Sequence, residues 1–384
     1  MNALLVLTRG FFMPVGNSCD ETYMRRAIEL AKMGLGHTNP NPLVGAVIVK
    51  DGVVIGEGYH HVYGQLHAER DAIKNCMERG NDPTGATIYV TLEPCSHFGK
   101  QPPCIHAVKE AGITKVVIGS RDPNPLVNGK GTAWLRENGI EVIEDFLRSE
   151  CDSINEIFFH YITTKTPFVA LKYAMTMDGK IATKTGDSKW ISCEKSRQHA
   201  HSLRNKYTCI LAGIGTVLAD DPMLNCRIPG GRNPVRIICD SSLKIPMESK
   251  IVKSAGEIPT IIAMAKNQSA ALTSKISALK EAGIEIFECG QDQVDLKEVM
   301  AYLAEKKLDS VLIEGGGEIN YSALKSGIVN KVYAYMAPKA FGGNGKSPVS
   351  GSGIEKVDDC FNFTISGTKM IDTDVLVKFR VQEK

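Results

Sequence analysis

One histidine and two cysteines of this chain have the types and spacing of zinc ligands. His67, with Glu69 two residues later, is followed by Cys95 and then by Cys104. Imidazole and thiolate groups bind zinc well, and three protein ligands leave a fourth position open for water, as in catalytic zinc sites. Glu69 is not needed as a ligand, so its carboxylate is free to carry protons. The pattern predicts a hydrolytic zinc site in which bound water ionises near neutral pH.

The order of histidine, glutamate, Pro-Cys and a second cysteine is typical of zinc deaminases that act on nucleobase-like rings. Their usual form has two residues between the cysteines, whereas the eight residues 96–103 separate them here. His97 and His106 lie nearby, and we interpret each as a substrate contact or a surface residue rather than a ligand. Because the chain holds eleven cysteines, a chance or purely structural origin stays open on spacing alone.

The elements that must hold these ligands follow from local composition. Two apolar, β-rich runs, 42–49 and 86–92, predict strands, and helices are predicted at 67–79 and 104–111. The histidine and the second cysteine then stand at helix starts, and Cys95 follows a strand end. Because the positive end of a helix dipole favours thiolate over thiol, these positions favour metal binding.

The length of 384 residues exceeds one typical hydrophobic core, so we expect two domains. Helices and strands alternate in the first half as far as a predicted helix at 151–162, and the polar segment 163–167 is the candidate linker. The sequence therefore predicts an α/β protein with three parts: an N-terminal extension (1–18), a zinc-dependent domain (19–165) and a second α/β domain (166–384). Strands of the second domain are expected at 168–174, 181–182, 208–212, 235–239, 260–265, 284–288, 310–313 and 331–337. Helices are expected there at 269–281, 296–306 and 319–325.

Composition excludes several classes of function. The net charge of +2 and dispersed basic residues lack the electrostatic signature of a nucleic-acid-binding protein. No apolar run approaches the roughly 20 residues of a membrane helix, and a signal peptide is not expected because Arg9 follows the short apolar run 3–7. Irregularly spaced cysteines favour reduced thiols. We expect a cytoplasmic homo-oligomer that acts on a small molecule, without nucleic-acid or membrane partners.

The second half contains a glycine-rich turn but no dinucleotide fingerprint G-x-G-x-x-G after a strand. The turn 314–317 follows a predicted strand and precedes a predicted helix, where backbone amides can approach a phosphate. A tight turn without a ligand explains the spacing equally well. Arg204, Arg227 and Arg232 are able to pair with a phosphate, and Trp190 with a flat ring, although surface and core roles are commoner. The residues alone predict a ligand-binding α/β domain.

Taken together, the motifs resemble the bifunctional deaminase/reductase family of riboflavin biosynthesis, RibD. The resemblance extends from about residue 19 to the C-terminus, and eight residues between the cysteines is the form that this family uses. It rests on 41–47, 67–69, 91–104 and 122–125 in the first half, and on 177–180, 190–192, 216–222 and 314–316 in the second.

The resemblance implies a cytidine-deaminase-like domain followed by a dihydrofolate-reductase-like domain, a fold that binds NADPH without the fingerprint. The first would remove the 2-amino group of 2,5-diamino-6-ribosylamino-4(3H)-pyrimidinone 5′-phosphate, with zinc on His67, Cys95 and Cys104 and with Glu69 moving protons. The second would reduce the ribosyl group to ribityl with NADPH.

The resemblance also implies contact residues. In the deaminase domain, the residues expected to contact substrate are Asn41, His60, His97, Lys100 and Asn124. In the reductase domain, the residues expected to contact substrate are Ser188, Arg204, Leu224, Arg227 and Glu314. The residues expected to contact the dinucleotide are Ala174, Trp190, Thr216, Asp220, Ser241 and Gly316. Lys172 would assist the reduction. Loop lengths differ from those of the family around Ser241.

Two other classes of protein remain to be compared. A nucleic-acid zinc deaminase with a C-terminal binding module predicts a basic surface and cysteines two residues apart, and the sequence has neither. A zinc-stabilised scaffold without enzyme activity has no use for Glu69 and would favour a fourth protein ligand.

Overall fold

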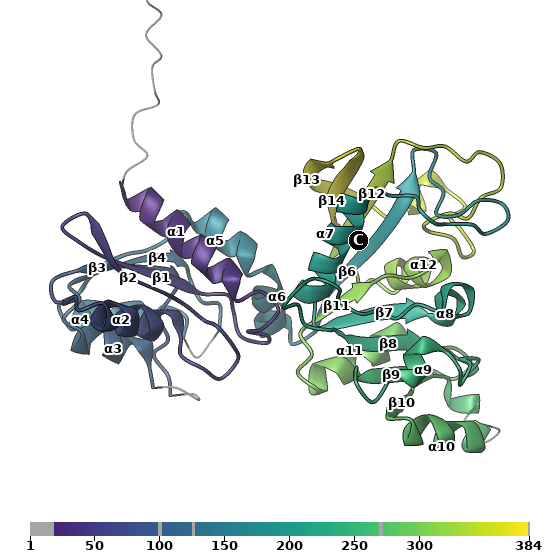
Figure 1. The fold of residues 1–384 in the computed structure, drawn as a ribbon, viewed down its shortest axis with the longest axis horizontal. Coiled ribbons are helices and arrows are strands. Elements are labelled where there is room, and N and C mark those ends of the chain that lie inside the picture. The colour runs from purple at the N-terminus through teal and green to yellow at the C-terminus, as the bar shows by residue number, and fades with distance from the viewer. Residues whose placement is uncertain (1–18, 99–101, 125–126, 269–271, 383–384) are drawn as a thin grey trace, which may run out of the picture. The chain divides into compact units, whose positions relative to one another are not determined.

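The computed structural model describes residues 19–98, 102–124, 127–268 and 272–382. The predicted N-terminal extension (1–18) and Lys100 lie outside the described residues. The chain forms two compact units, one made of residues up to Gly34 with Pro42–Glu156, the other of Leu35–Asn41 with Ile157–Lys384. Each unit has its own β-sheet (Figure 1).

The sheet of the first unit has five strands in the order β2-β1-β3-β4-β5. β1 (Gly45–Lys50) pairs antiparallel with β2 (Val53–Tyr59) and with β3 (Thr87–Leu92), whereas β4 (Lys115–Ser120) and β5 (Glu141–Ile143) continue in parallel. The strand β2 was not predicted. It forms because the Asp-Gly pair between β1 and β2 has positive φ at both residues, which closes a two-residue hairpin.

Helices cover both faces of this sheet (Figure 1). α1 (Cys19–Met33) and α5 (Arg148–Ile154) lie on one face, and α2 (Ala68–Glu78), α3 (Cys104–Glu110) and α4 (Lys130–Glu137) lie on the other. Alternate residues of one strand therefore enter different cores, as the period of two of a β-strand requires. The first unit is thus a three-layered α/β domain, as predicted.

The second unit has nine strands in the order β10-β9-β8-β7-β11-β6-β12-β14-β13. The first seven in this order are parallel, and the last two form an antiparallel hairpin at the edge. Parallel strands are β6 (Phe168–Thr176), β7 (Cys209–Gly213), β8 (Val235–Cys239), β9 (Thr260–Met264), β10 (Ile284–Glu288), β11 (Ser310–Ile313) and β12 (Lys331–Ala337). The hairpin consists of β13 (Phe363–Ile371) and β14 (Asp374–Val381).

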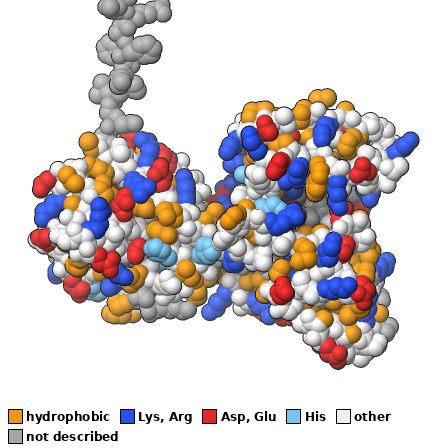
Figure 2. Space-filling view, in the orientation of Figure 1, with side chains coloured by type: hydrophobic (Ala, Val, Ile, Leu, Met, Phe, Trp, Pro, Cys, Tyr) orange, Lys and Arg blue, Asp and Glu red, His pale blue; other side chains and the backbone are white. Residues whose placement is uncertain are grey.

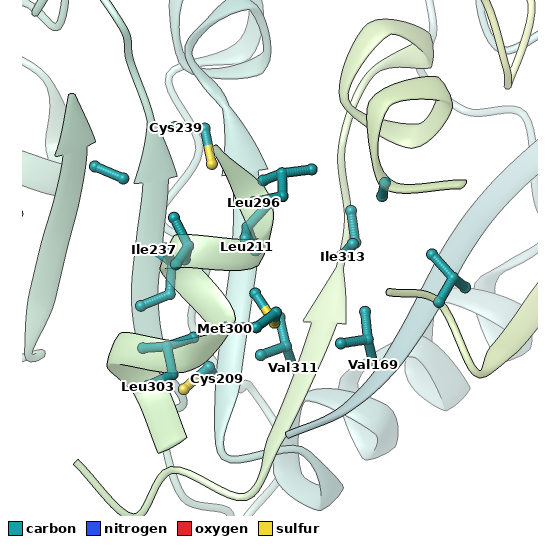
Figure 3. Packing of buried hydrophobic residues seen from close by; sticks show 14 of the residues in the cluster. Val169, Cys209, Leu211, Ile237, Cys239, Leu296, Met300, Leu303, Val311 and Ile313 are labelled. Atoms are coloured by element: carbon teal, nitrogen blue, oxygen red, sulfur yellow. The ribbon is translucent and has the colours of Figure 1, made fainter. Parts of the chain in front are cut away.

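Helices also cover both faces of the nine-stranded sheet. Its helices are α6 (Glu156–Thr164), α7 (Glu194–Lys206), α8 (Ile214–Asp220), α9 (Lys250–Lys253), α10 (Thr273–Glu281), α11 (Leu296–Glu305) and α12 (Gly317–Lys325), with single turns η1 (Lys266–Gln268) and η3 (Val357–Asp359). α11 and α12 share one core with the sheet, and α6 to α10 pack on the opposite face. In Figure 3, Leu296, Met300 and Leu303 of α11 face Leu211 and Val311 of neighbouring strands.

The structure differs from the sequence expectations in several further elements. The helix predicted at 151–162 is two helices, because the side chain of Asn155 accepts a hydrogen bond from Leu43 N and donates one to Leu43 O. The strand predicted at 181–182 is only an isolated bridge from Ala182 to Lys346. The edge hairpin and α7 were not predicted.

The division into units falls one helix earlier than the linker predicted at 163–167. Ile157 of α6 packs in one core with Phe168 and Leu203 of the second unit, and Tyr161 donates a hydrogen bond to Ala304 O. α6 therefore belongs to the second unit by its contacts. Among the described residues, none of the helices combines the length and the apolar character needed to span a bilayer.

Candidate active sites

The structure brings together the three predicted zinc ligands. His67 is the residue that caps the N-terminus of α2, Cys104 is the first residue of α3, and Cys95 follows β3, as predicted. Their ligand atoms all lie within 4.8 Å of one another, with His67 Nδ1 3.6 Å from Cys95 Sγ and 3.4 Å from Cys104 Sγ. A nitrogen and a sulfur on one tetrahedral zinc ion would be about 3.6 Å apart, from usual bond lengths. The donor set and its spacing therefore fit zinc.

The local environment favours a thiolate at this cluster. Hydrogen bonds from Cys104 and His67 lower the pKa of Cys95, and its sulfur also accepts the backbone N–H of Cys104 at the start of α3. The hydrogen bond with Cys95 and burial raise the pKa of Cys104, so the two thiols share one proton. A metal cation displaces such a proton, since zinc binds the thiolate form.

Glu69 lies beside the three predicted zinc ligands but does not belong to the cluster of ligand atoms. It belongs to the first turn of α2, and only 3% of it is exposed. Burial raises the pKa of its carboxyl group, and the negative charge of Cys95 raises it further. A carboxyl group whose pKa is shifted toward neutrality is able both to accept and to return a proton.

Two predicted substrate contacts of the first unit differ in their bonding. His60 is buried, with Nδ1 2.9 Å from Leu66 O and its ring edge-on to His67 at 5.4 Å, and burial lowers its pKa. His97 is half-buried, and its Nδ1 atom has no hydrogen-bond partner among the described residues. An unpaired buried nitrogen carries a desolvation cost, which a bound polar ligand would relieve.

Glu93 is a positioning residue that the sequence analysis missed. Its buried carboxylate accepts the backbone N–H groups of Gly129 at 3.1 Å and Gly131 at 3.2 Å. A Cβ on Gly131 would lie 2.4 Å from Pro94 O, so only glycine allows this approach. The segment that begins with Asn124 is thereby fastened to the segment that carries Cys95. The one feature of the sequence that could have indicated Glu93 is its position two residues before the predicted ligand Cys95.

The second unit contains a cavity of about 330 Å³ at the carboxyl ends of β6, β7 and β11. In open parallel sheets, ligands bind at this edge. Every predicted reductase residue except Ser241 lines it: Lys172, Ala174, Ser188, Trp190, Arg204, Thr216, Asp220, Leu224, Arg227, Glu314 and Gly316. Ser241 lies after β8, where its Oγ accepts a hydrogen bond from Val294 N.

A buried ion cluster forms the floor of this cavity. Glu314 accepts two hydrogen bonds from Arg204, one on Oε1 from Nε at 2.7 Å and one on Oε2 from Nη2 at 3.0 Å, and Lys172 Nζ lies 3.6 Å from Oε2. Burial alone would raise the pKa of Glu314, but the charges of Arg204 and Lys172 outweigh it and hold the pKa at about 2. The carboxylate is therefore ionised and fixes both cations at the cavity.

The glycine-rich turn has one glycine that the fold itself does not require. A Cβ on Gly315 would lie 1.8 Å from Ile319, and one on Gly317 would lie 2.4 Å from Ser350 Oγ. A Cβ on Gly316 would meet only Thr216 Oγ1 at 3.8 Å, an ordinary contact. Since Gly316 lines the cavity and caps α12, its missing side chain leaves room for a ligand at a helix N-terminus.

Known proteins share both halves of this arrangement. The family description "RibD C-terminal domain" matches residues 167–377, and "cytidine and deoxycytidylate deaminase zinc-binding region" matches residues 17–120. The riboflavin biosynthesis protein RibD of Actinobacillus pleuropneumoniae is 50% identical to this chain, covering 94% of it and 95% of the relative. The chain belongs to the RibD family. RibD of Escherichia coli is 35% identical, covering 93% of this chain and 98% of the relative.

Solved structures agree with this assignment. A diaminohydroxyphosphoribosylaminopyrimidine deaminase/5-amino-6-(5-phosphoribosylamino)uracil reductase from Thermotoga maritima has a TM-score of 0.83 and 41% identity, covering 95% of this chain and 99% of the other. Acinetobacter baumannii RibD has a TM-score of 0.82 and 34% identity over the same shares. The predicted order of a cytidine-deaminase-like domain and a reductase domain is confirmed. The chain is a bifunctional deaminase and reductase of riboflavin biosynthesis.

Family membership sets aside the nucleic-acid deaminase, because the second domain is a RibD reductase rather than a binding module. In agreement, basic and acidic side chains are interspersed over the face drawn in Figure 2. The enzyme acts on a small molecule.

Two other predicted substrate contacts lie outside the described residues or outside the first unit. Lys100 lies outside the described residues, and Asn41 belongs to the second unit by its contacts. The segment that ends at Asn41 is held there by Asn39, whose side chain donates a hydrogen bond to Asp309 at 2.7 Å. His201 of α7, which also lines the reductase cavity, was missed, since nothing in its local sequence marks it.

Proposed function

We propose that the chain catalyses two consecutive steps on one small molecule. The first unit would hydrolyse the 2-amino group of 2,5-diamino-6-ribosylamino-4(3H)-pyrimidinone 5′-phosphate, and the second would reduce the ribosyl group of the product to ribityl with NADPH. The observation that carries this proposal is the convergence of three zinc-ligand atoms beside a buried glutamate that is not among them.

The deamination step assigns roles to residues of the first unit. Zinc on His67, Cys95 and Cys104 would lower the pKa of a water molecule to about 7 and so supply a nucleophile at neutral pH. Glu69 would accept one proton of that water and transfer it to a ring nitrogen as the oxygen bonds to carbon. It would then accept the second proton from the new hydroxyl group and give it to the amino group, which leaves as ammonia while the oxygen stays on carbon. The Nδ1 atom of His97 has no hydrogen-bond partner among the described residues, which supports a direct contact with substrate. The other proposed contacts are Asn41, His60, Lys100 and Asn124.

The reduction step adds one hydride and one proton to the ribosyl group. NADPH would supply the hydride. Lys172, an ammonium group held beside Glu314, would supply the proton. Arg227 would bind the substrate phosphate, and Ser188, Arg204, Leu224 and Glu314 would contact the rest of the substrate. The dinucleotide contacts are Ala174, Trp190, Thr216, Asp220 and Gly316, with Ser241 proposed on resemblance alone.

We further propose that residues 19–165 and 166–384 each carry one activity, and that the enzyme is a cytoplasmic homo-oligomer. All eleven cysteines are free thiols, which supports a reducing compartment. The assembly rests on the sequence expectation and requires measurement of the mass in solution.

Product analysis tests both activities. Purified protein with the diaminopyrimidine and no NADPH should accumulate the product in which oxygen has replaced the amino group, and NADPH should convert it to the product with two more hydrogens. Glu69→Gln should retain zinc but lose about 10²–10⁴-fold in deamination, while still reducing pre-deaminated substrate at the wild-type rate. Failure of the wild-type protein to release ammonia would refute the proposal.

Complementation then tests whether the two activities are independent. Arg227→Ala should deaminate normally and accumulate unreduced product, because it has lost a charge partner for the phosphate. A mixture of Glu69→Gln and Arg227→Ala should restore the full conversion if the intermediate diffuses freely. If Glu69→Gln with intact zinc fails to oxidise NADPH on pre-deaminated substrate, the two activities are coupled.

A further inference from the structure

Helix α7 holds one wall of the reductase cavity in place. His201 and Arg204 are three residues apart on this helix, so their side chains leave it on the same face. Arg204 donates a hydrogen bond through Nη1 to Asn225 O at 2.8 Å. The segment that begins with Leu224 and reaches Arg227 is therefore attached to α7 at the point where it lines the cavity.

His201 makes the second attachment, to Arg227. Its Nε2 atom lies 3.0 Å from Arg227 Nε, and its Nδ1 atom lies 3.3 Å from Arg227 N. Both arginine groups are donors, and a neutral imidazole has only one acceptor nitrogen. The shorter contact assigns the lone pair to Nε2 and the proton to Nδ1, so that the ring accepts a hydrogen bond from the guanidinium.

The charges that face His201 preserve this acceptor role. Burial lowers the pKa of the imidazole, and the cations of Arg204, Arg227 and Lys172 lower it further against the opposing charge of Glu314, to about 4. A protonated ring would have no acceptor and would repel Arg227. At neutral pH the ring is therefore uncharged.

A fixed guanidinium has an energetic advantage at this position. Arg227 is exposed, and a free arginine side chain loses rotamer entropy when it binds a ligand. A hydrogen bond to the ring removes part of that freedom before substrate arrives, so less is lost on binding.

We propose that His201 is a positioning residue of the reduction site, whose imidazole Nε2 holds the Arg227 guanidinium ready for the phosphate of the substrate. This inference rests on the proposed function of the second unit. It adds a residue that acts through Arg227 and does not itself touch the reacting atoms.

Substitution of His201 by glutamine or by asparagine tests which of the two ring nitrogens holds Arg227. The amide oxygen of His201→Gln reaches the place of Nε2, and that of His201→Asn reaches only the place of Nδ1. We expect His201→Asn and His201→Leu to raise KM for the deaminated substrate about tenfold, the loss of one hydrogen bond to a charged group, with kcat and the Kd of NADPH unchanged. His201→Gln should restore KM to within about threefold. Gln198→Leu, on the exposed side of α7, is the matched control.

A double-mutant cycle separates positioning from general structure. If His201 acts through Arg227, then His201→Leu should not raise KM further in a chain that already carries Arg227→Met. The inference would be overturned if the fold-increase in KM of the double variant equals the product of the increases in the two single variants. It would also be overturned if KM is unchanged in both His201→Leu and His201→Asn. An unchanged Kd of NADPH in the same variants reports that the second unit is folded. If the wild-type enzyme itself fails to oxidise NADPH on deaminated substrate, the proposed function is wrong.

Discussion

The buried ion cluster of the second unit makes a quantitative prediction about Glu314→Gln. The pKa of this carboxyl group is held at about 2 instead of 4.5, which corresponds to about 3 kcal/mol in favour of the ionised form. The amide keeps the shape but leaves Arg204 and Lys172 without their negative partner, and Arg204 is only 15% exposed. We expect the free energy of unfolding of this unit to fall by about 3 kcal/mol, within the range for breaking a buried ion pair.

The assay is calorimetry of the full chain at neutral pH. About 3 kcal/mol corresponds to a decrease in Tm of roughly 6–12 °C for a unit of this size. The transition of the first unit should not move, and ammonia release should continue at the wild-type rate. Glu305→Gln, which removes one negative charge from an exposed position on α11, should leave both transitions unchanged.

The pH dependence of the difference in unfolding free energy between wild type and Glu314→Gln identifies the cause of that difference. Because the pKa of Glu314 is lower in the folded chain than in the unfolded one, its contribution is fully present above pH 4.5 and is lost as the pH falls toward 2. The stability of wild type and Glu314→Gln should therefore converge over this window. A variant as stable as wild type at neutral pH, or a difference that stays constant below pH 4.5, would refute the ion-pair reasoning.

Three further substitutions test the remaining parts of the two sites. Cys95→Ser should lose both zinc and deamination, whereas Cys360→Ser should keep both, as metal analysis and ammonia release will show. Gly316→Val should raise the Kd of NADPH roughly tenfold or more without affecting deamination, because the fold tolerates a Cβ there but a bound ligand does not; unchanged NADPH binding would make the turn purely structural. Glu93→Gln should keep zinc but lower the free energy of unfolding of the first unit by about 2 kcal/mol in denaturant titrations, since an amide cannot accept from both glycines with equal strength. If Glu93→Gln is as stable as wild type, Glu93 does not act as a positioning residue.

Local sequence predicted an element correctly where the apolar character of its residues was enough to show that they are buried. The parallel strands β7, β8 and β11 are buried on both faces, so their apolar runs were visible without knowledge of their partners. The edge hairpin was missed for the converse reason. Most of β13 is exposed, and its position depends on pairing with β14 rather than on its own composition.

The sequence by itself determined the α/β class and predicted the zinc ligands and the proton carrier, because these depend on residue types at short spacings that local structure preserves. Only the tertiary structure decided how distant residues meet. It brought Glu93 to the backbone of Gly129 and His201 to Arg227, and it left Ser241 out of the lining of the cavity that the other predicted reductase residues share. Such contacts join elements that are far apart in the chain, and nothing in either partner's local sequence specifies the other.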